Sequence, residues 1–262
     1  VDVPDYDNEI KERIVKEFAK YDVCISCSDA LDYEYRHAFG YKGEVLHTGY
    51  PRNDIFFRAD THIKNKIYEL FGLDKNKGII LYAPTFRNIR EKSVSRYDLD
   101  LDKIIQAAEN RFGMKYQVVY RFHYNLSDVY SDSQLFSRGV NATSYPDMQE
   151  LLLAADILLT DYSSSMWDFS LQRKPVFLYH SDLDLYMSDR GFYSRPDEWP
   201  YPSGRSTEEL CREITTFDSE LYRMKVDEFF EKYGSYDDGH ATERVVDRVL
   251  DVMRLPDKYG KA

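Results

Sequence analysis

Two serines, Ser163 and Ser164, stand at a junction that suits an anion. They follow residues 157–159, a short apolar run typical of a buried parallel strand, and precede an apolar-periodic segment that begins at Met166. A strand, a tight turn of small residues and a helix start together form half of a βαβ unit. Such a turn offers hydroxyl and unpaired N–H groups to a phosphate at the start of a helix. Serine is also a preferred N-cap residue, so the turn by itself leaves a plain capping role open.

Polar or strand-breaking residues also follow the predicted strands at residues 79–83 and 117–121. They are Pro84, Thr85, Arg121, Phe122 and His123. Strands and helical segments alternate from residue 79 onward, which predicts an α/β fold with a doubly wound parallel sheet. In this architecture the carboxyl ends of neighbouring strands meet at one crevice, where ligands bind. We therefore expect these residues to share a site with the two serines.

The side chains of this predicted crevice suit a diphosphate. The guanidinium groups of Arg52 and Arg121 and the serine hydroxyls bind phosphate oxygens well. Asp168 is able to hold ribose or polyol hydroxyls, or only to occupy the first turn of its helix, where the dipole favours an acid. His123 suits an acid–base role or a cationic donor to a phosphate oxygen, unless it is simply a histidine satisfied at a strand end.

Composition argues against several classes of partner. The formal net charge is −11 over 262 residues, whereas nucleic acid requires clustered lysine and arginine. The same charge argues against strong adsorption to anionic lipid. No apolar stretch reaches the about 18 residues of a membrane span. Three cysteines make no disulfide framework, so we expect a reducing, cytoplasmic setting.

The remaining motifs carry less chemistry. Cys24 and Cys27 lie inside a predicted strand without a second Cys/His pair of matching spacing, so we expect a structural role. Neither a P-loop nor a Gly-x-Gly-x-x-Gly fingerprint occurs. Asp182 and Asp184 are interpreted as solvated charge, and residues 182–193 as a loop. We therefore predict no metal and no cofactor.

Six motifs occur in one order between about residue 21 and about residue 195. They are Gly49-Tyr-Pro-Arg-Asn-Asp54, Leu81-Tyr-Ala-Pro-Thr-Phe-Arg87, Arg121-Phe-His123, Tyr145-Pro-Asp-Met-Gln-Glu-Leu151, Ile157-Leu-Leu-Thr-Asp-Tyr-Ser-Ser164 with Asp168, and Arg190-Gly-Phe-Tyr193. Their set and order resemble the CDP-glycerol glycerophosphotransferase family, the teichoic acid and capsule polymerases and primases of the TagF type.

The resemblance implies a GT-B-like enzyme of two Rossmann-type domains that binds its donor in the intervening cleft. Residues 1–60 would be the tail of the N-terminal domain, and residues 61–262 the C-terminal donor-binding domain with a final crossover helix. By resemblance His123 is one of the family's two essential histidines and stabilises charge on the pyrophosphate. The matching positions that would line the donor site are Arg52, Pro84, Thr85, Arg121, Phe122, His123, Ser163, Ser164 and Asp168.

The family's other histidine belongs to a Trp-His-Gly-x-Pro motif that this sequence lacks. Neither Trp167 nor Trp199 is followed by histidine, and the chain begins at Val1 rather than at Met. We therefore expect a fragment that lacks its N-terminal domain and is nearly inactive by itself.

The resemblance implies transfer of glycerol phosphate from CDP-glycerol to a hydroxyl of a growing teichoic acid or capsular polymer, with release of CMP. Two alternatives stay open: a CDP-ribitol-dependent ribitol-phosphate transferase, and a catalytically silent nucleotide-binding module that needs a partner domain. The acceptor implied by the resemblance is lipid-linked. We therefore expect the parent protein in the cytoplasm, peripheral on the inner face of the bacterial cell membrane.

Overall fold

The computed structural model describes residues 8–58, 61–85, 99–122, 139–189, 192 and 194–254. The chain divides into two compact units. The larger unit is built mainly from Asp60–Asp227, and the smaller one combines Asp5–Ala59 with Glu228–Ala262. Two segments that are far apart in the sequence therefore fold together in the smaller unit.

The larger unit contains a parallel sheet of six strands, counted over the described residues. The strands are β3 (Gly78–Tyr82), β4 (Tyr116–Tyr120), β5 (Gly139–Asn141), β6 (Ile157–Thr160), β7 (Val176–Tyr179) and β8 (Ser203–Gly204). They lie in the order β5-β4-β3-β6-β7-β8, and every pairing is parallel. This order is that of a doubly wound sheet, so the predicted α/β fold class is confirmed.

The central strands are almost entirely apolar because both faces of the sheet are covered. Every residue of β3 and β7 is buried, and so is every residue of β6. Leu81, at the centre of β3, lies opposite Val119 on one side and Leu158 on the other. Near-continuous apolar runs are the usual signature of such doubly covered parallel strands.

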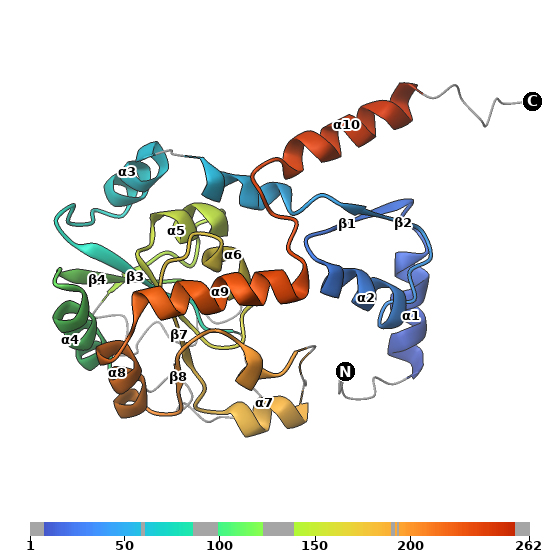
Figure 1. Ribbon diagram of the computed structural model, residues 1–262. Helices are drawn as coiled ribbons and strands as arrows, with labels where there is room; N and C mark the ends of the chain where they lie inside the picture. Colours follow the sequence, from blue (N-terminus) through green and yellow to red (C-terminus); the bar gives the residue numbers. More distant parts are fainter. Residues whose placement is uncertain are drawn as a thin grey trace, which may run out of the picture. The chain divides into compact units, whose positions relative to one another are not determined.

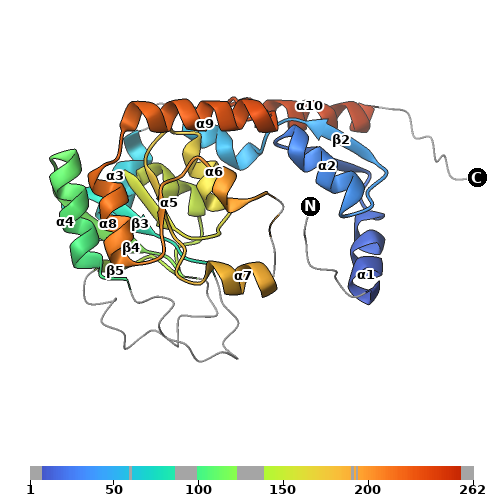
Figure 2. The ribbon, with the colours of Figure 1, turned by 60° about the horizontal axis from the view of Figure 1, so that its bottom comes forward.

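Helices cover the two faces of this sheet (Figure 1). On one face α4 (Leu101–Phe112) and α8 (Thr207–Thr215) lie side by side, as the turned view in Figure 2 also shows. On the other face α5 (Met148–Ala154) contacts both α3 (Thr61–Leu70) and α6 (Ser165–Ser170). Each crossover brings the chain back to the edge of the sheet where the strands begin. All strands therefore run in one direction and end at the same edge.

The bounds of α4 follow from local sequence signals. The Asp100 carboxylate accepts a hydrogen bond from the Lys103 backbone N–H at 3.2 Å, as an N-cap residue does. Gly113 then ends the helix with a φ of 70°, a left-handed conformation that glycine adopts without a Cβ clash. Sequence and structure agree here because the start and stop signals are both local.

The prediction of a loop at residues 182–193 is wrong in its first half. Helix α7 (Leu183–Asp189) occupies this part, and the 3-10 turn η5 (Pro196–Glu198) precedes β8. In α7 the ring of Tyr186 packs on Tyr162, with ring centroids 4.2 Å apart. The contact between Tyr186 and the distant Tyr162 thus stabilises α7, whose own sequence is too short to predict a helix.

The smaller unit joins its two chain segments through the start of α10. Its elements are α1 (Asn8–Phe18), β1 (Val23–Ser26), α2 (Asp29–His37), β2 (Glu44–His47), η1 (Pro51–Phe57) and α10 (Ala241–Arg254), and α9 (Ser219–Tyr233) spans the boundary between the units. β1 and β2 pair in parallel. The Asp54 carboxylate accepts hydrogen bonds from the N–H groups of Ala241 and Thr242, at 3.0 and 2.8 Å. That this unit is the tail of an N-terminal domain stays a prediction.

Lys174 is a largely buried amine that holds the carboxyl end of α5. Its Nζ donates to the carbonyl oxygens of Leu153 and Ala155, at 3.0 and 2.7 Å. Burial lowers the pKa of Lys174 to about 8, although the nearby Asp156 carboxylate opposes the shift. Folding therefore favours the neutral amine over the ammonium form.

The substitution Lys174→Met is expected to change how stability depends on pH. Between about pH 8 and the usual lysine pKa the unfolded chain binds more protons than the folded one, so the Lys174 contribution rises with pH. The free energy of unfolding of the wild type, minus that of the variant, should increase by about 1 kcal/mol per pH unit in this window. Urea unfolding from pH 7 to 10 measures the difference, and a flat difference would contradict the burial of the charge.

Candidate functional site

The predicted crevice lies where the strand order changes direction. From β3 the chain moves outward to β4 and β5, whereas from β6 it moves the opposite way to β7 and β8. Segments that leave the carboxyl ends of β3 and β6 are therefore neighbours, since these two strands pair directly. This switch point is the usual ligand position of doubly wound sheets.

Asp161 joins the two segments at the switch point. It follows β6 directly and is buried, with 5% of its surface exposed. The Thr85 backbone N–H donates to Asp161 Oδ1 at 2.8 Å, and Thr85 Oγ1 donates to Oδ2 at 3.0 Å. The N–H of Tyr162 also donates to Oδ1, at 2.6 Å. One carboxylate thus fixes the end of β3 against the start of the serine turn.

The serine turn, residues 161–165, divides its hydroxyl groups between two roles. Ser163 Oγ lies 2.8 Å from Ser165 Oγ and accepts a hydrogen bond from the Ser165 N–H at 3.3 Å. Ser163 therefore stabilises the start of α6, which is the plain capping role that the sequence left open. Ser164 is the N-cap residue of α6, is exposed, and makes no side-chain capping bond. Ser164 is therefore open to solvent at the start of α6, in the part of the chain that the structure describes.

Arg121 follows β4, the neighbour of β3, at the same edge of the sheet. Its N–H donates to the Tyr82 carbonyl oxygen at 2.9 Å, which continues the ladder past the strand end. Among the described residues, no atom accepts a hydrogen bond from its buried Nη1. Burial lowers the pKa of Arg121, and the Asp147 carboxylate only partly opposes this. An anion beside this guanidinium would relieve the desolvation of its charge.

Asp168 lies in the first turn of α6 and is held by a residue of α5. Gln149 Nε2 donates to Asp168 Oδ2 at 3.0 Å. The amide fixes the orientation of the carboxylate at the edge where Ser164 is exposed. Gln149 was not singled out from the sequence, and its place in the Tyr145–Leu151 motif is the one signal that points to it.

Not all of the expected donor-site residues lie at this edge as exposed side chains. Phe122 is buried and packs edge-on against Tyr82, with ring centroids 6.0 Å apart, and Pro84 is buried as well. Arg52 belongs to the smaller unit, where its guanidinium lies 4.1 Å from the centre of the Tyr50 ring. His123 lies outside the described residues. The roles of all nine expected residues in donor binding stay predictions.

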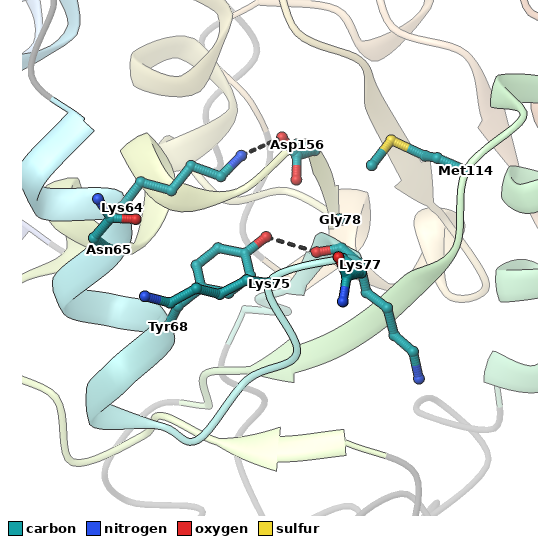
Figure 3. A pocket seen from close by; sticks show the side chains of 9 residues that line it. Lys64, Asn65, Tyr68, Lys75, Lys77, Gly78, Met114 and Asp156 are labelled. Atoms are coloured by element: carbon teal, nitrogen blue, oxygen red, sulfur yellow. Dashed lines mark hydrogen bonds and ion pairs between the residues drawn. The ribbon is translucent and has the colours of Figure 1, made fainter.

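A pocket of about 200 Å³ lies at the opposite edge of the sheet (Figure 3). Gly78 at the start of β3 and Asp156 just before β6 line it, together with Lys64 and Tyr68 of α3. Lys64 Nζ is ion-paired with Asp156 Oδ1 at 2.7 Å, as Figure 3 shows. This pocket is separate from the switch point, because it adjoins the amino ends of the strands.

The described residues hold no cluster of three or more histidine, cysteine or acidic side chains arranged to bind a metal ion. Cys24 lies within β1 and Cys27 follows it directly, and neither forms a disulfide bond with another described residue. None of the described helices is both long enough and apolar enough to cross a membrane.

The family was identified by comparison with known proteins. Residues 2–251 match the family described as CDP-glycerol:poly(glycerophosphate) glycerophosphotransferase. The chain belongs to this family. The resemblance inferred from six short motifs is thereby confirmed over nearly the whole chain.

Characterised members of this glycerophosphotransferase family are similar to the chain along most of its length. A teichoic acid poly(glycerol phosphate) polymerase of Bacillus spizizenii is 29% identical over 245 residues, which are 92% of this chain and 62% of that protein. A teichoic acid poly(ribitol-phosphate) polymerase of the same organism is 30% identical over 244 residues, which are 90% of this chain and 38% of that protein.

A solved structure of the wall teichoic acid polymerase TagF matches with a TM-score of 0.79 and 29% identity. The match covers 97% of this chain and 63% of the TagF chain. The chain thus spans less than two thirds of the length of each of these family members.

Proposed function

We propose that the chain carries the donor-binding part of an enzyme that transfers glycerol phosphate from CDP-glycerol to a hydroxyl of a growing teichoic acid or capsular polymer. The observation that carries this proposal is the buried Nη1 atom of the Arg121 guanidinium, which meets no acceptor among the described residues. It lies at the switch-point edge, where the family's nucleotide diphosphate donor would supply oxygens. CMP is the leaving group.

The donor would be held by the residues that follow three neighbouring strands. Arg121 and the exposed Ser164 hydroxyl would bind phosphate oxygens. The Asp168 carboxylate, oriented by Gln149, would accept hydrogen bonds from ribose or polyol hydroxyls. His123 would stabilise the charge that develops on the pyrophosphate as the bond to CMP breaks. In-line phosphoryl transfer requires mainly such positioning and charge stabilisation.

CDP-ribitol is the competing donor, because a ribitol-phosphate polymerase also matches the chain, although the glycerol-phosphate polymerases match it better. Glycerol phosphate is favoured as in the family's own description. The acceptor would be a lipid-linked polymer, with the protein at the inner face of the cell membrane. An N-terminal GT-B-like domain would complete the donor cleft.

Calorimetric titration of the full-length protein with CDP-glycerol, CDP-ribitol and CMP tests the proposal. The tighter-binding CDP-polyol identifies the donor, and it should bind more tightly than CMP. In Arg121→Gln its affinity should fall by about ten- to a hundredfold, since a hydrogen bond to a charged group contributes about 1.5–3 kcal/mol.

The matched control is Arg111→Gln on α4, where the guanidinium donates through Nε to the Phe217 carbonyl oxygen at 2.6 Å and lies over the Phe112 ring. This variant should bind the donor as the wild type does. If no cytidine nucleotide binds the folded wild type, or if both variants bind donor equally well, the proposed function is wrong.

A further inference from the structure

Asp182 is buried at the switch-point edge, contrary to its interpretation as solvated charge. Only 7% of its surface is exposed, and it follows β7, the neighbour of β6. Tyr162 Oη donates a hydrogen bond to Asp182 Oδ1 at 3.1 Å. Its neighbour in the sequence pattern, Asp184, does remain exposed, where it pairs with Arg205 at 3.0 Å. A buried carboxylate is costly unless it accepts hydrogen bonds, so its position is defined by its partners.

Tyr162 is the second residue of the serine turn, and aromatic rings enclose it. Its ring stacks on His180, with centroids 4.9 Å apart and an interplanar angle of 17°. Tyr186 of α7 and Phe192 lie 4.2 and 5.4 Å from it, centroid to centroid. The ring is therefore held on several sides, and the hydroxyl bond to Asp182 sets its orientation.

The serine turn is thus fixed at two consecutive residues. Asp161 ties it to the end of β3 through Thr85, and Tyr162 ties it to the end of β7 through Asp182. Ser163 and Ser164 come next, and within the described part of the chain neither side chain bonds to a segment that follows a neighbouring strand. Their placement depends on the two preceding anchors, because each peptide unit is planar and leaves only two soft dihedral angles per residue.

We propose that Tyr162 and Asp182 are positioning residues that hold the serine turn in the geometry required for the diphosphate of the donor. The identity of the ligand rests on the proposed function, whereas the anchoring of the turn rests on the structure alone. Neither residue is a catalytic residue. Their effect would reach the donor through the hydroxyl and N–H groups of Ser163 and Ser164.

The test compares Tyr162→Phe with Tyr68→Phe in the full-length protein. Tyr68 is also buried, and its hydroxyl donates to the Lys77 carbonyl oxygen at 2.7 Å, at the opposite edge of the same sheet (Figure 3). Both variants lose one buried hydroxyl hydrogen bond and keep the ring, so their losses of stability should be similar. Only Tyr162→Phe is expected to change the conformation of the serine turn.

Two measurements are made on each variant. Amide hydrogen exchange at residues 163–166 should become about tenfold faster in Tyr162→Phe and in Asp182→Ala, and should stay unchanged in Tyr68→Phe. The KM for the CDP-polyol should rise by about tenfold in the same two variants, with a smaller change in kcat. Asp182→Asn keeps an oxygen that accepts from Tyr162, so its KM should rise only about twofold.

Unchanged exchange at the turn in Tyr162→Phe would overturn the proposal, and so would an equal rise of the KM in the Tyr68→Phe control. If hydrogen exchange at the turn becomes faster in Tyr162→Phe as expected, but the wild type binds no CDP-polyol, the anchoring is supported and the donor assignment is overturned. The failure of this inference and the failure of the proposed function therefore give different results.

Discussion

Asp161→Ala is expected to destabilise the protein by about 3 kcal/mol, because three donors lose their acceptor at once. Two of these donors are backbone N–H groups, those of Thr85 and Tyr162, at the junction of β3 and β6. Urea unfolding of the wild type and the variant measures the change. The loss is a large fraction of the stability of an ordinary domain.

Asp100→Ala provides the matched control for this substitution. Asp100 is an exposed N-cap residue whose side chain accepts one backbone hydrogen bond, so its loss should cost about 1 kcal/mol. Asp161→Asn keeps one oxygen for the Thr85 N–H and should fall between the two alanine variants. If Asp161→Ala cost no more than Asp100→Ala, the carboxylate would not be what joins the two segments.

His123→Ala is expected to reduce the release of CMP from the CDP-polyol by about a hundred- to a thousandfold, the usual effect of removing one donor to a transition-state charge. Donor binding should weaken far less, since Arg121 and Ser164 would still hold the diphosphate. Single-turnover release of CMP by the full-length protein, together with a donor titration, separates the two effects.

His62→Ala controls for the loss of an imidazole, because His62 is exposed on α3. It should leave the release of CMP unchanged. His123→Gln keeps an N–H donor without a positive charge, so partial activity in this variant favours a hydrogen-bonding role over a cationic one. Release of CMP at the wild-type rate in His123→Ala would refute the role that the family resemblance implies.

Much of the fold was predictable because its signals are local. The run at residues 79–83 is too short and too apolar for an exposed element, and it forms β3. The Asp100 cap and Gly113 delimit α4 at the expected residues. Among the elements that were not predicted, α7 and β8 are short, and β8 has only two residues. No periodic pattern is detectable over two residues, so strand pairing with β7 alone defines β8.

The sequence predicted at which edge of the sheet the candidate site lies, but not which of its side chains contact one another. Thr85, Arg121 and Ser164 were all expected at strand ends, and parallel pairing brings these ends to one side. Asp182 was misinterpreted because an acid after a strand is usually solvated. Its burial depends on Tyr162, which lies 20 residues away in the sequence.

The sequence by itself determined the order of strands and helices, the polar residues that end each strand, and the family to which the chain belongs. These properties are carried by apolar periodicity, turn residues and short motifs, all of which act over a few neighbouring positions. Only the tertiary structure decided that Asp161 bonds to Thr85, that Gln149 orients Asp168 and that Tyr162 anchors on Asp182. Such pairs form between residues brought together by packing, and many polar groups are able to bond to each carboxylate until packing selects its partners.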